Sequence, residues 1–340
     1  MSITYQAPPA GPTESVTQEE LLELLRIAYK ITVSDGRMQQ EVKANVIQAA
    51  TYPVRGLEGI CAAIGAALLP TDYMVSTYRN LADVIAKGIP LGNVIAEISG
   101  RATGVAGGKG GAMHMTDTAV GFMTTTGIVG SGLPIANGLA LASQMSGDER
   151  VTAVTFGDGA TSIGAVHEAL NLAALWKLPI VFVCQNNGWG EHTPVHEYMA
   201  QTDIVLKAQG YGISSERVDG FDAVASYGAV RRAVAAARSG EGPRFIEAVS
   251  YRLSGHTATT DFSYMDKDLL ARLKENDAVA RLRAQLRGAG ADALVDQVQA
   301  EVDAEVDAAF AFALSSPYPD QHAAYTDAYA AGTSAPEAAR

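Results

Sequence analysis

The 340-residue sequence predicts an α/β protein built on a doubly wound parallel sheet, with helical extensions at both ends of the chain. Two apolar, β-branched runs, 151–156 (VTAVTF) and 180–184 (IVFVC), flank a helical stretch over 164–176. Strands that are apolar throughout are typical of a parallel sheet covered on both faces, and a helix of this length suits a right-handed crossover. A second strand–helix–strand pattern follows over 213–250.

The N-terminal elements are predicted from capping and periodicity. Thr17 and Glu20 form a Thr-x-x-Glu capping box, and the apolar residues that follow recur at helical spacing, which predicts a helix. A second helix is predicted over 59–69, which is rich in Ala and Ile, and a short strand over 73–77. The glycine-rich segment 101–115, taken alone, is typical of a flexible linker.

The C-terminal half continues the alternation of strands and helices. Strands are predicted over 213–218 and 244–250, with a helix over 223–238 between them. From Lys267 onward the chain is Ala-rich, charged and predicted to be helical, and it ends in a Tyr-containing tail after 316–319 (SPYP). The predicted divisions are an N-terminal arm with helices (1–50), an α/β domain (51–265) and a helical extension (266–340).

Composition excludes several classes of protein. Hydrophobic residues make up 48% of the chain and charged residues 18%, which argues against disorder. The balance of 25 basic against 37 acidic residues gives a net charge of −12 and disfavours a nucleic-acid binder. No apolar stretch is long enough to span a membrane, and residues 1–14 lack the pattern of a secretion signal. Cys61 and Cys184 stand apart in apolar surroundings, so we expect buried reduced thiols and a cytoplasmic protein.

Two polar side chains directly follow the strands of the central strand–helix–strand unit. Asp158 follows the first strand and Asn187 the second, and the carboxyl ends of parallel strands meet at one edge of a sheet. Carboxylate and amide oxygens suit Mg²⁺, while the helix after Gly159 offers N–H groups to an anion. Each motif alone is more often an ordinary turn. Together they predict one Mg²⁺ that bridges a diphosphate.

The two motifs and the spacing between them resemble those of a known protein family. Gly157-Asp158-Gly159 and Asn186-Asn187, with 26 residues between Gly159 and Asn186, resemble the thiamine-diphosphate motif. The stretch 171–194 (NLAALWKLPIVFVCQNNGWGEHTP) resembles the α subunits of heterotetrameric 2-oxo acid and acetoin dehydrogenases, the E1 components. The resemblance implies the thiamine-diphosphate-binding, pyrophosphate-type fold. It extends through GGKGGAMHM (107–115), GIVG (127–130), YRLSGHT (251–257) and the SPYP segment.

The resemblance also implies which residues bind the cofactor. Asp158, Asn187 and the backbone carbonyl of Trp189 would ligate Mg²⁺. The residues assigned to thiamine diphosphate are Tyr78, Arg79, Gly127, Ile128, Val129, Gly157, Asp158, Gly159, Ala160, Gln185, Asn187 and His256.

Several of these residues have individual roles by resemblance. Arg79 would clamp a phosphate group, a task that suits the guanidinium fork. Gly127 would accept a hydrogen bond from the aminopyrimidine, and Val129 would support the bent shape of thiamine. His256 matches the catalytic histidine on a mobile loop. Thr257 falls where some members carry a regulatory phosphoserine.

Two histidine-containing segments have alternative interpretations. His192 and His196 have the spacing of a zinc pair, but Pro194 disfavours the helix that would place both on one face. The Met-His-Met segment at 113–115 is expected to pack beside the glycine-rich segment rather than to bind metal.

The sequence departs from the family on the substrate side of the site. Tyr52 stands where the family generally has a histidine, and the segment 80–83 (NLAD) replaces a histidine-containing segment, with Leu81 among the changed residues. Tyrosine is bulkier and far less acidic at neutral pH than histidine. We therefore hypothesise a substrate other than pyruvate and a pocket that is less cationic than in pyruvate-specific relatives.

By resemblance, the chain is the E1 alpha subunit of an oxidoreductase that cleaves acetoin or a 2-oxo acid. A β subunit would supply the activating glutamate in an α2β2 assembly, and a lipoyl-bearing E2 acyltransferase would receive the acyl group. GIVGSG and NNGWGEHTP favour acetoin. A pyruvate or branched-chain E1 alpha subunit, and an acyloin lyase or ligase without a lipoyl partner, are alternatives.

A nicotinamide-dependent oxidoreductase is disfavoured by the absence of a Gly-x-Gly-x-x-Gly motif in the required context. A non-catalytic scaffold is disfavoured by the intact Asp158, Asn187 and Arg79.

Overall fold

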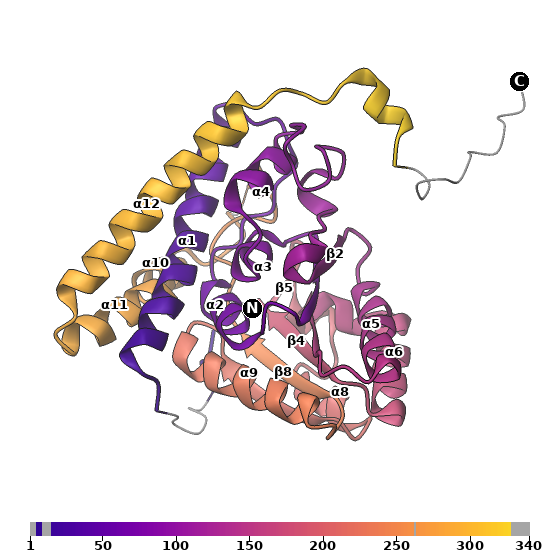
Figure 1. The fold of residues 1–340 in the computed structure, drawn as a ribbon. Coiled ribbons are helices and arrows are strands. Elements are labelled where there is room, and N and C mark those ends of the chain that lie inside the picture. Colours follow the sequence, from indigo (N-terminus) through magenta and orange to yellow (C-terminus); the bar gives the residue numbers. More distant parts are fainter. Residues whose placement is uncertain (1–4, 9–14, 262, 328–340) are drawn as a thin grey trace, which may run out of the picture.

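A six-stranded parallel sheet with the order β2-β1-β3-β4-β8-β7 runs through the computed structural model, which describes residues 5–8, 15–261 and 263–327 (Figure 1). Every strand pair in it is parallel, which confirms the predicted sheet. The strands are β1 (Tyr73–Thr77), β2 (Phe122–Thr126), β3 (Thr152–Gly157), β4 (Ile180–Asn186), β7 (Ser214–Asp219) and β8 (Arg244–Val249). A short antiparallel ribbon, β5 (Trp189–Gly190) with β6 (Thr193–Pro194), follows β4.

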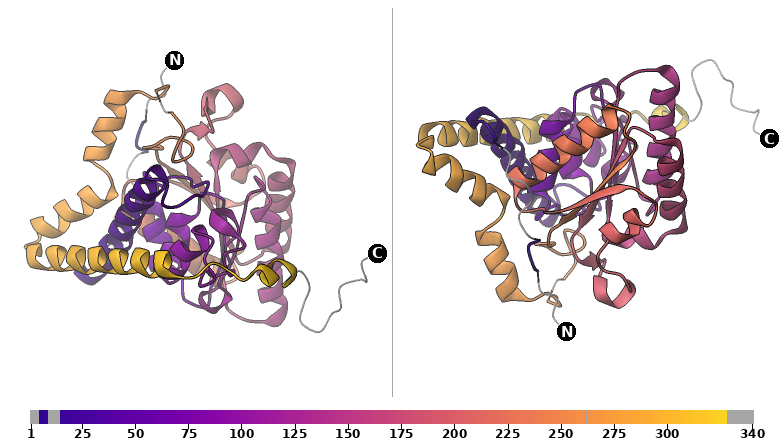
Figure 2. Two further views of the ribbon diagram at one scale, coloured as in Figure 1. Left: turned by 90° about the horizontal axis from the view of Figure 1, so that it is seen from above. Right: turned by 90° about the horizontal axis from the view of Figure 1, so that it is seen from below.

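Helices cover both faces of the sheet, as the predicted doubly wound fold requires. One face packs against α2 (Glu58–Ala67) and α9 (Ala223–Arg238), and the other against α5 (Gly132–Ser146), α6 (Gly164–Trp176) and α8 (Val205–Gln209) (Figure 2). Neighbouring strand residues alternate between the two cores, because side chains along a strand point to opposite faces. Along β3 and β4, Ala153, Val181 and Val183 enter the first core, and Val154, Phe156, Ile180 and Phe182 enter the second.

The N-terminal and C-terminal helices pack against each other. The predicted capping box begins α1 (Gln18–Lys43), with both of its hydrogen bonds formed, and α1 lies along α12 (Asp292–Ser315) (Figure 1). Arg26 of α1 pairs with Glu301 of α12 at 2.6 Å. The remaining helices are α3 (Leu81–Ala86), α4 (Leu91–Ile98), α7 (Val195–Tyr198), α10 (Lys267–Glu275) and α11 (Ala278–Gly288).

Most predicted elements are confirmed, and some were not predicted. The bounds of β1, α6 and α9 match the prediction, whereas β3 and β7 each lie one residue further along the chain. Strand β2 and helices α3, α4, α5, α7 and α8 were not predicted. The division of the chain at 50/51 and 265/266 stays a prediction. Most of the N-terminal stretch and the end of the tail lie outside the described residues.

The glycine-rich segment 101–115 is not a flexible linker, because a buried carboxylate organises it. Glu97, at the end of α4, is fully buried. Its Oε2 accepts hydrogen bonds from the N–H groups of Ala106 (2.8 Å) and Gly108 (2.9 Å). Its Oε1 accepts from Gly110 (2.7 Å) and Gly111 (3.1 Å). Charge-assisted bonds of this kind are about twice as strong as neutral ones, so Glu97 fixes the path of the segment.

The segment after α12 also contacts the glycine-rich segment. The Arg101 guanidinium lies 4.0 Å from the centre of the Tyr318 ring and donates to the carbonyl of Ser316 at 3.0 Å. The Ala102 N–H donates to the carbonyl of Pro317 at 2.9 Å. The predicted SPYP segment is thus part of the packed structure. Among the described residues, no helix has the length and apolar character needed to span a membrane.

Candidate active site

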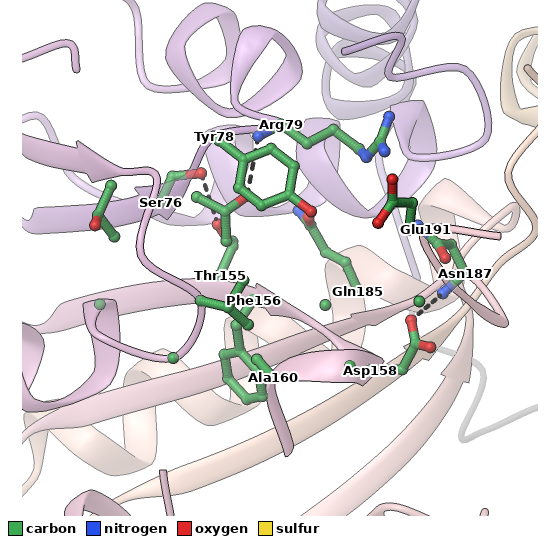
Figure 3. Close-up of a pocket in the computed structure, with 18 of the residues that line it drawn as sticks. Ser76, Tyr78, Arg79, Thr155, Phe156, Asp158, Ala160, Gln185, Asn187 and Glu191 are labelled. Atoms are coloured by element: carbon green, nitrogen blue, oxygen red, sulfur yellow. Dashed lines mark hydrogen bonds between the residues drawn. The ribbon is translucent and has the colours of Figure 1, made fainter. Parts of the chain in front are cut away.

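A cavity of about 330 Å³ opens at the carboxyl ends of β1 to β4 (Figure 3). The site residues that the sequence predicted and that line this cavity are Tyr78, Arg79, Ile128, Val129, Gly157, Asp158, Gly159, Ala160, Gln185, Asn187, Trp189 and His256. Gly127 is an exception: its neighbours Thr126 and Ile128 line the cavity, but Gly127 faces the side chains of Met113 and His114. The sheet therefore brings together residues that are nearly 180 positions apart in the chain.

Asp158 and Asn187 meet at the ends of β3 and β4, as the crossover geometry predicted. The strands pair in register at Gly157 and Gln185, and Asp158 Oδ1 accepts a hydrogen bond from the Asn187 N–H at 3.2 Å (Figure 3). The Tyr198 hydroxyl donates to Asp158 Oδ2. Burial raises the pKa of the Asp158 carboxyl above its ordinary value. Within the described chain no basic side chain forms an ion pair with this buried carboxylate, which is the environment in which a bound cation is most favourable.

A metal ion would find three oxygen donors here. The Asp158 carboxylate follows β3, and the Asn187 amide oxygen and the backbone carbonyl of Trp189 follow the neighbouring strand β4. The Asn187 amide oxygen at present accepts the Trp189 N–H at 3.0 Å, which fixes the turn. One carboxylate with neutral oxygen donors suits Mg²⁺, which keeps waters or phosphate oxygens in its shell.

Two buried guanidinium groups stand beside the cavity, and neither has a carboxylate partner among the residues that the structure describes. Arg79 is 8% exposed and donates to the carbonyls of Pro53 and His256, the latter at 3.1 Å. Arg252 is 2% exposed and donates to the carbonyl of Glu191 and the hydroxyl of Tyr264, both at 2.6 Å. Burial lowers the pKa of both groups, that of Arg79 to about 10. Desolvated cations without a counter-ion favour an anionic ligand.

His256 lies against Arg79 and is held neutral. Its Nδ1 lies 3.3 Å from Arg79 Nη2 and, in the neutral ring, accepts from it. Burial, and next the charges of Arg79 and Arg252, lower the pKa of His256 to about 4. The ring therefore carries its proton on Nε2 and can donate it to a ligand at neutral pH.

Tyr52, the residue that departs from the family pattern, lies among the site residues. Its ring centre is 4.6 Å from that of Tyr78 and 5.4 Å from that of His256. The Arg79 guanidinium lies 5.8 Å from the Tyr52 ring centre. A tyrosine at this position thus adds an aromatic surface beside the two candidate phosphate-binding groups, and no second imidazole.

Sequence reasoning missed the buried polar side chains below and beside the cavity. Ser76 and Thr155 line the cavity from within two mainly apolar strands, and Asp83 lies fully buried behind them. A polar residue inside an apolar strand near its carboxyl end is the signal that could have identified the first two. Tyr198 and Arg252 gave no such signal, because their contacts form only in the folded chain.

The alternative metal and modification sites gain no support. The described residues contain no group of three His, Cys, Asp or Glu side chains arranged for a metal ion. His192 lies 3.9 Å from Glu191, and its ring centre is 6.1 Å from that of His256. The Thr257 hydroxyl contacts that of Thr260 at 2.6 Å. Cys61 and Cys184 are buried and free, as predicted.

The chain is similar to a known enzyme family over most of its length. The family model described as "Dehydrogenase E1 component" matches residues 30–322. The chain is 36% identical over 317 residues to the alpha subunit of acetoin:2,6-dichlorophenolindophenol oxidoreductase from Bacillus subtilis, which covers 93% of this chain and 95% of that one. It is 34% identical over 326 residues to the pyruvate dehydrogenase E1 component subunit alpha of Zymomonas mobilis, with 95% and 92% covered. A similar subunit from Rhizobium meliloti is 36% identical over 275 residues, with 80% and 79% covered.

Proposed function

The chain belongs to the dehydrogenase E1 component family, and from this membership we propose that it is the alpha subunit of a thiamine-diphosphate-dependent enzyme that oxidatively cleaves acetoin or a related small carbonyl compound. The proposal depends mainly on one observation: at one sheet edge lie a buried carboxylate, Asp158, and two buried guanidinium groups, Arg79 and Arg252, none of which forms an ion pair with another described residue. A metal–diphosphate group supplies the charges that both lack.

Asp158, Asn187 and the Trp189 carbonyl are the proposed Mg²⁺ ligands. Burial of Asp158 disfavours its charged form in the cofactor-free protein, so a cation is favoured there. The Asn187 N–H holds one carboxylate oxygen in place. The role of these residues is to position a diphosphate so that the cofactor lies in the cavity in a fixed orientation.

Arg79 and His256 are the proposed partners of the diphosphate oxygens. The Arg79 guanidinium is already held by two carbonyls, so it loses little freedom when it binds a phosphate. A neutral His256 donates from Nε2, and the approach of negative charge raises its proton affinity. His256 is therefore suited to hold or pass a proton beside the cofactor. The cofactor itself, when bound, supplies the carbon nucleophile and the electron sink for C–C cleavage.

The proposed partners follow from the charged groups that line the cavity. Within the described part of the chain, the residues that line the cavity provide charges for a metal and a diphosphate, and Glu191 is the remaining carboxylate among them. We propose that a β subunit completes the site in an α2β2 assembly and supplies the activating glutamate. The acyl group would pass to a lipoyl-bearing E2 acyltransferase.

Acetoin is the proposed substrate class because of the residues around the cavity mouth. Tyr52 replaces a potential cation with an aromatic ring beside His256, and Ile128 and Val129 provide apolar lining. The similarity to an acetoin-oxidising alpha subunit over 95% of its length supports the same choice. A 2-oxo acid carries a carboxylate that needs a cationic partner of its own, and in this proposal both buried guanidinium groups, Arg79 and Arg252, are committed to the metal–diphosphate group.

The test is dye reduction by the chain co-purified with its candidate β subunit, measured with acetoin, pyruvate and branched-chain 2-oxo acids. We expect activity that requires both thiamine diphosphate and Mg²⁺ and that is highest with acetoin. Asp158→Ala should abolish it, whereas Asp296→Ala, an exposed position on α12, should retain it. Activity in Asp158→Ala, or a clear preference for pyruvate, would contradict the proposal. Cofactor binding without dye reduction would favour an acyloin lyase or ligase.

A further inference from the structure

A buried carboxylate lies directly behind one wall of the cavity. Asp83, in α3, is fully buried and is not itself part of the lining. Its Oδ2 accepts hydrogen bonds from the hydroxyls of Ser76 and Thr155, the latter at 2.8 Å. Its Oδ1 accepts from Gln185 Nε2 at 3.1 Å and from the Cys61 thiol at 3.2 Å. Ser76, Thr155 and Gln185 all line the cavity.

Ser76, Thr155 and Gln185 form one wall of the cavity, and none of their side-chain protons is free to bind a ligand. The single hydroxyl proton of Ser76 is directed to Asp83, and that of Thr155 to Asp83 or to Ser76 Oγ at 3.0 Å. The two amide protons of Gln185 are directed to Asp83 and to Cys61 Sγ at 3.3 Å. What remains for the cavity is the Gln185 carbonyl oxygen and hydroxyl lone pairs, which are acceptors.

Burial and hydrogen bonding act in opposite directions on the charge of Asp83. Burial raises the pKa of Asp83, and the four hydrogen bonds from neutral donors oppose that rise. Burial also raises the pKa of the Cys61 thiol well above its ordinary value, so Cys61 keeps the proton that it donates. Four neutral donors point at the Asp83 oxygens, which is the arrangement that an ionised carboxylate requires, because it only accepts hydrogen bonds.

The polarity of this wall differs from that of the metal and phosphate end of the cavity. In the view of Figure 3, Ser76 and Thr155 lie away from Asp158 and Asn187, with Gln185 between the two pairs. We propose that Asp83 is a positioning residue that makes the wall of Ser76, Thr155 and Gln185 acceptor-only. This wall selects a neutral 2-hydroxy ketone, whose hydroxyl it can bind, over a 2-oxo acid, whose carboxylate finds no donor there. The inference rests on the proposed function, and it deepens it by naming the residues that discriminate between substrates.

Asp83→Asn should reverse the polarity of the wall in either orientation of the new amide. If its NH2 group faces Ser76 and Thr155, the two hydroxyls become acceptors on that side and their protons turn to the cavity. If its NH2 group faces Gln185, the Gln185 amide must turn over and present its own NH2 group to the cavity. Both outcomes add donors without a change in the shape of the wall.

The experiment compares kcat/KM for acetoin and pyruvate in the co-purified enzyme with bound cofactor. We expect Asp83→Asn to raise the ratio of kcat/KM for pyruvate to that for acetoin by about tenfold or more, because unpaired buried polar groups dominate such discrimination. The matched control is Asp72→Asn, a fully buried aspartate that precedes β1 and pairs with Arg238 at 2.7 Å. It should lower thermal stability and leave the ratio unchanged.

One further variant and one binding measurement test the role of Asp83 separately from the proposed function. If Asp83→Asn does not fold, Thr155→Val removes one acceptor and should lower kcat/KM for acetoin but not for pyruvate. An unchanged ratio in Asp83→Asn, or equal losses for both substrates in Thr155→Val, would overturn the inference. If the wild-type enzyme oxidises neither compound, the proposed function fails. The role of Asp83 is then tested by calorimetric titration of acetoin and of pyruvate into the same assembly. Asp83→Asn must still shift the ratio of the Kd values for the two compounds in favour of pyruvate. An unchanged ratio overturns the inference.

Discussion

Replacement of Asp158 by asparagine is expected to stabilise the cofactor-free protein while it abolishes the response to Mg²⁺ and thiamine diphosphate. The carboxylate is 1% exposed and has the Tyr198 hydroxyl and the Asn187 N–H as its partners. Asparagine retains both contacts: its oxygen accepts from Asn187, and its NH2 group donates to the Tyr198 oxygen. What is lost is the buried negative charge.

The expected gain follows from the penalty for burying an ion without a counter-ion. Relief of an uncompensated but hydrogen-bonded carboxylate is worth about 1–3 kcal/mol. For a chain of this length a change of 1 kcal/mol shifts Tm by roughly 2 °C, so Asp158→Asn should raise the Tm of the cofactor-free protein by about 2–6 °C. In wild type, cofactor at about 100 times its Kd should add roughly 2.7 kcal/mol. The variant should gain nothing.

The same reasoning predicts how the difference changes with pH. The folded-state pKa of Asp158 lies above its ordinary value of 3.8, so the folded protein binds this proton more tightly than the unfolded chain does. The resulting stability is present below pH 3.8 and is lost as the pH rises through the folded pKa. The advantage of Asp158→Asn should therefore be small in acid and should grow toward neutral pH.

Thermal unfolding of wild type and variant, with and without cofactor, at acidic and neutral pH, measures all of these effects. Asp296→Asn, at an exposed position, controls for a general effect of removing negative charge from an acidic protein. A lower Tm for cofactor-free Asp158→Asn at neutral pH, or a cofactor-induced increase equal to that of wild type, would refute the reasoning.

Three further predictions concern neighbouring groups. Arg79→Lys should raise the Kd for thiamine diphosphate about ten- to hundredfold, because an ammonium group cannot form the paired bonds of a guanidinium; an unchanged Kd by calorimetry would contradict this. Binding of inorganic pyrophosphate with Mg²⁺ should raise the pKa of His256 from about 4 toward neutrality, because the anion opposes the charge of Arg79. Titration by ¹³C NMR, with His256→Asn to assign the signal, would disprove this by showing no shift. Glu97→Gln should lower stability by about 2–4 kcal/mol, because its NH2 group would face backbone donors; amide exchange over 104–113 that matches wild type would argue against it.

The sheet was largely predictable because burial on both faces leaves a strong pattern in the sequence. Strands β3 and β4 are apolar over most of their length, and the helix between them indicates that they are parallel. Strand β2 was missed because FMTTT is short and rich in threonine, so its apolar signal is weak. Helix α5 was missed because a Gly-Leu-Pro start conceals its periodicity. The glycine-rich segment was interpreted as a linker because its organising partner, Glu97, acts through backbone N–H groups that have no signature in the sequence.

Some residues of the candidate site could likewise be predicted from the sequence, and others could not. Asp158 and Asn187 were predictable, since each directly follows a strand and the topology dictates where strand ends meet. Asp83 was noticed as part of a segment that departs from the family, and its function in directing the protons of Ser76 and Gln185 depends on three elements that only the folded chain brings together. The neutral state of His256 likewise depends first on its burial and then on Arg79 and Arg252, which come from opposite ends of the α/β region.

The pairing of the first and last long helices affects the order in which the chain can fold during synthesis. Arg26 and Glu301 are 275 positions apart, so at translation rates of 5–20 residues per second α1 waits roughly 15 to 60 s for its partner. Through that interval the part of α1 that packs against α12 is uncovered on the nascent chain, whereas the part that packs against α2 and α3 can already be covered. The contacts of Arg101 and Ala102 with Ser316 and Pro317 form later still. We expect that ribosome-bound chains lacking α12 will recruit chaperones and will leave the glycine-rich segment accessible to protease, although every candidate cofactor-binding residue, up to His256, precedes α12 in the chain.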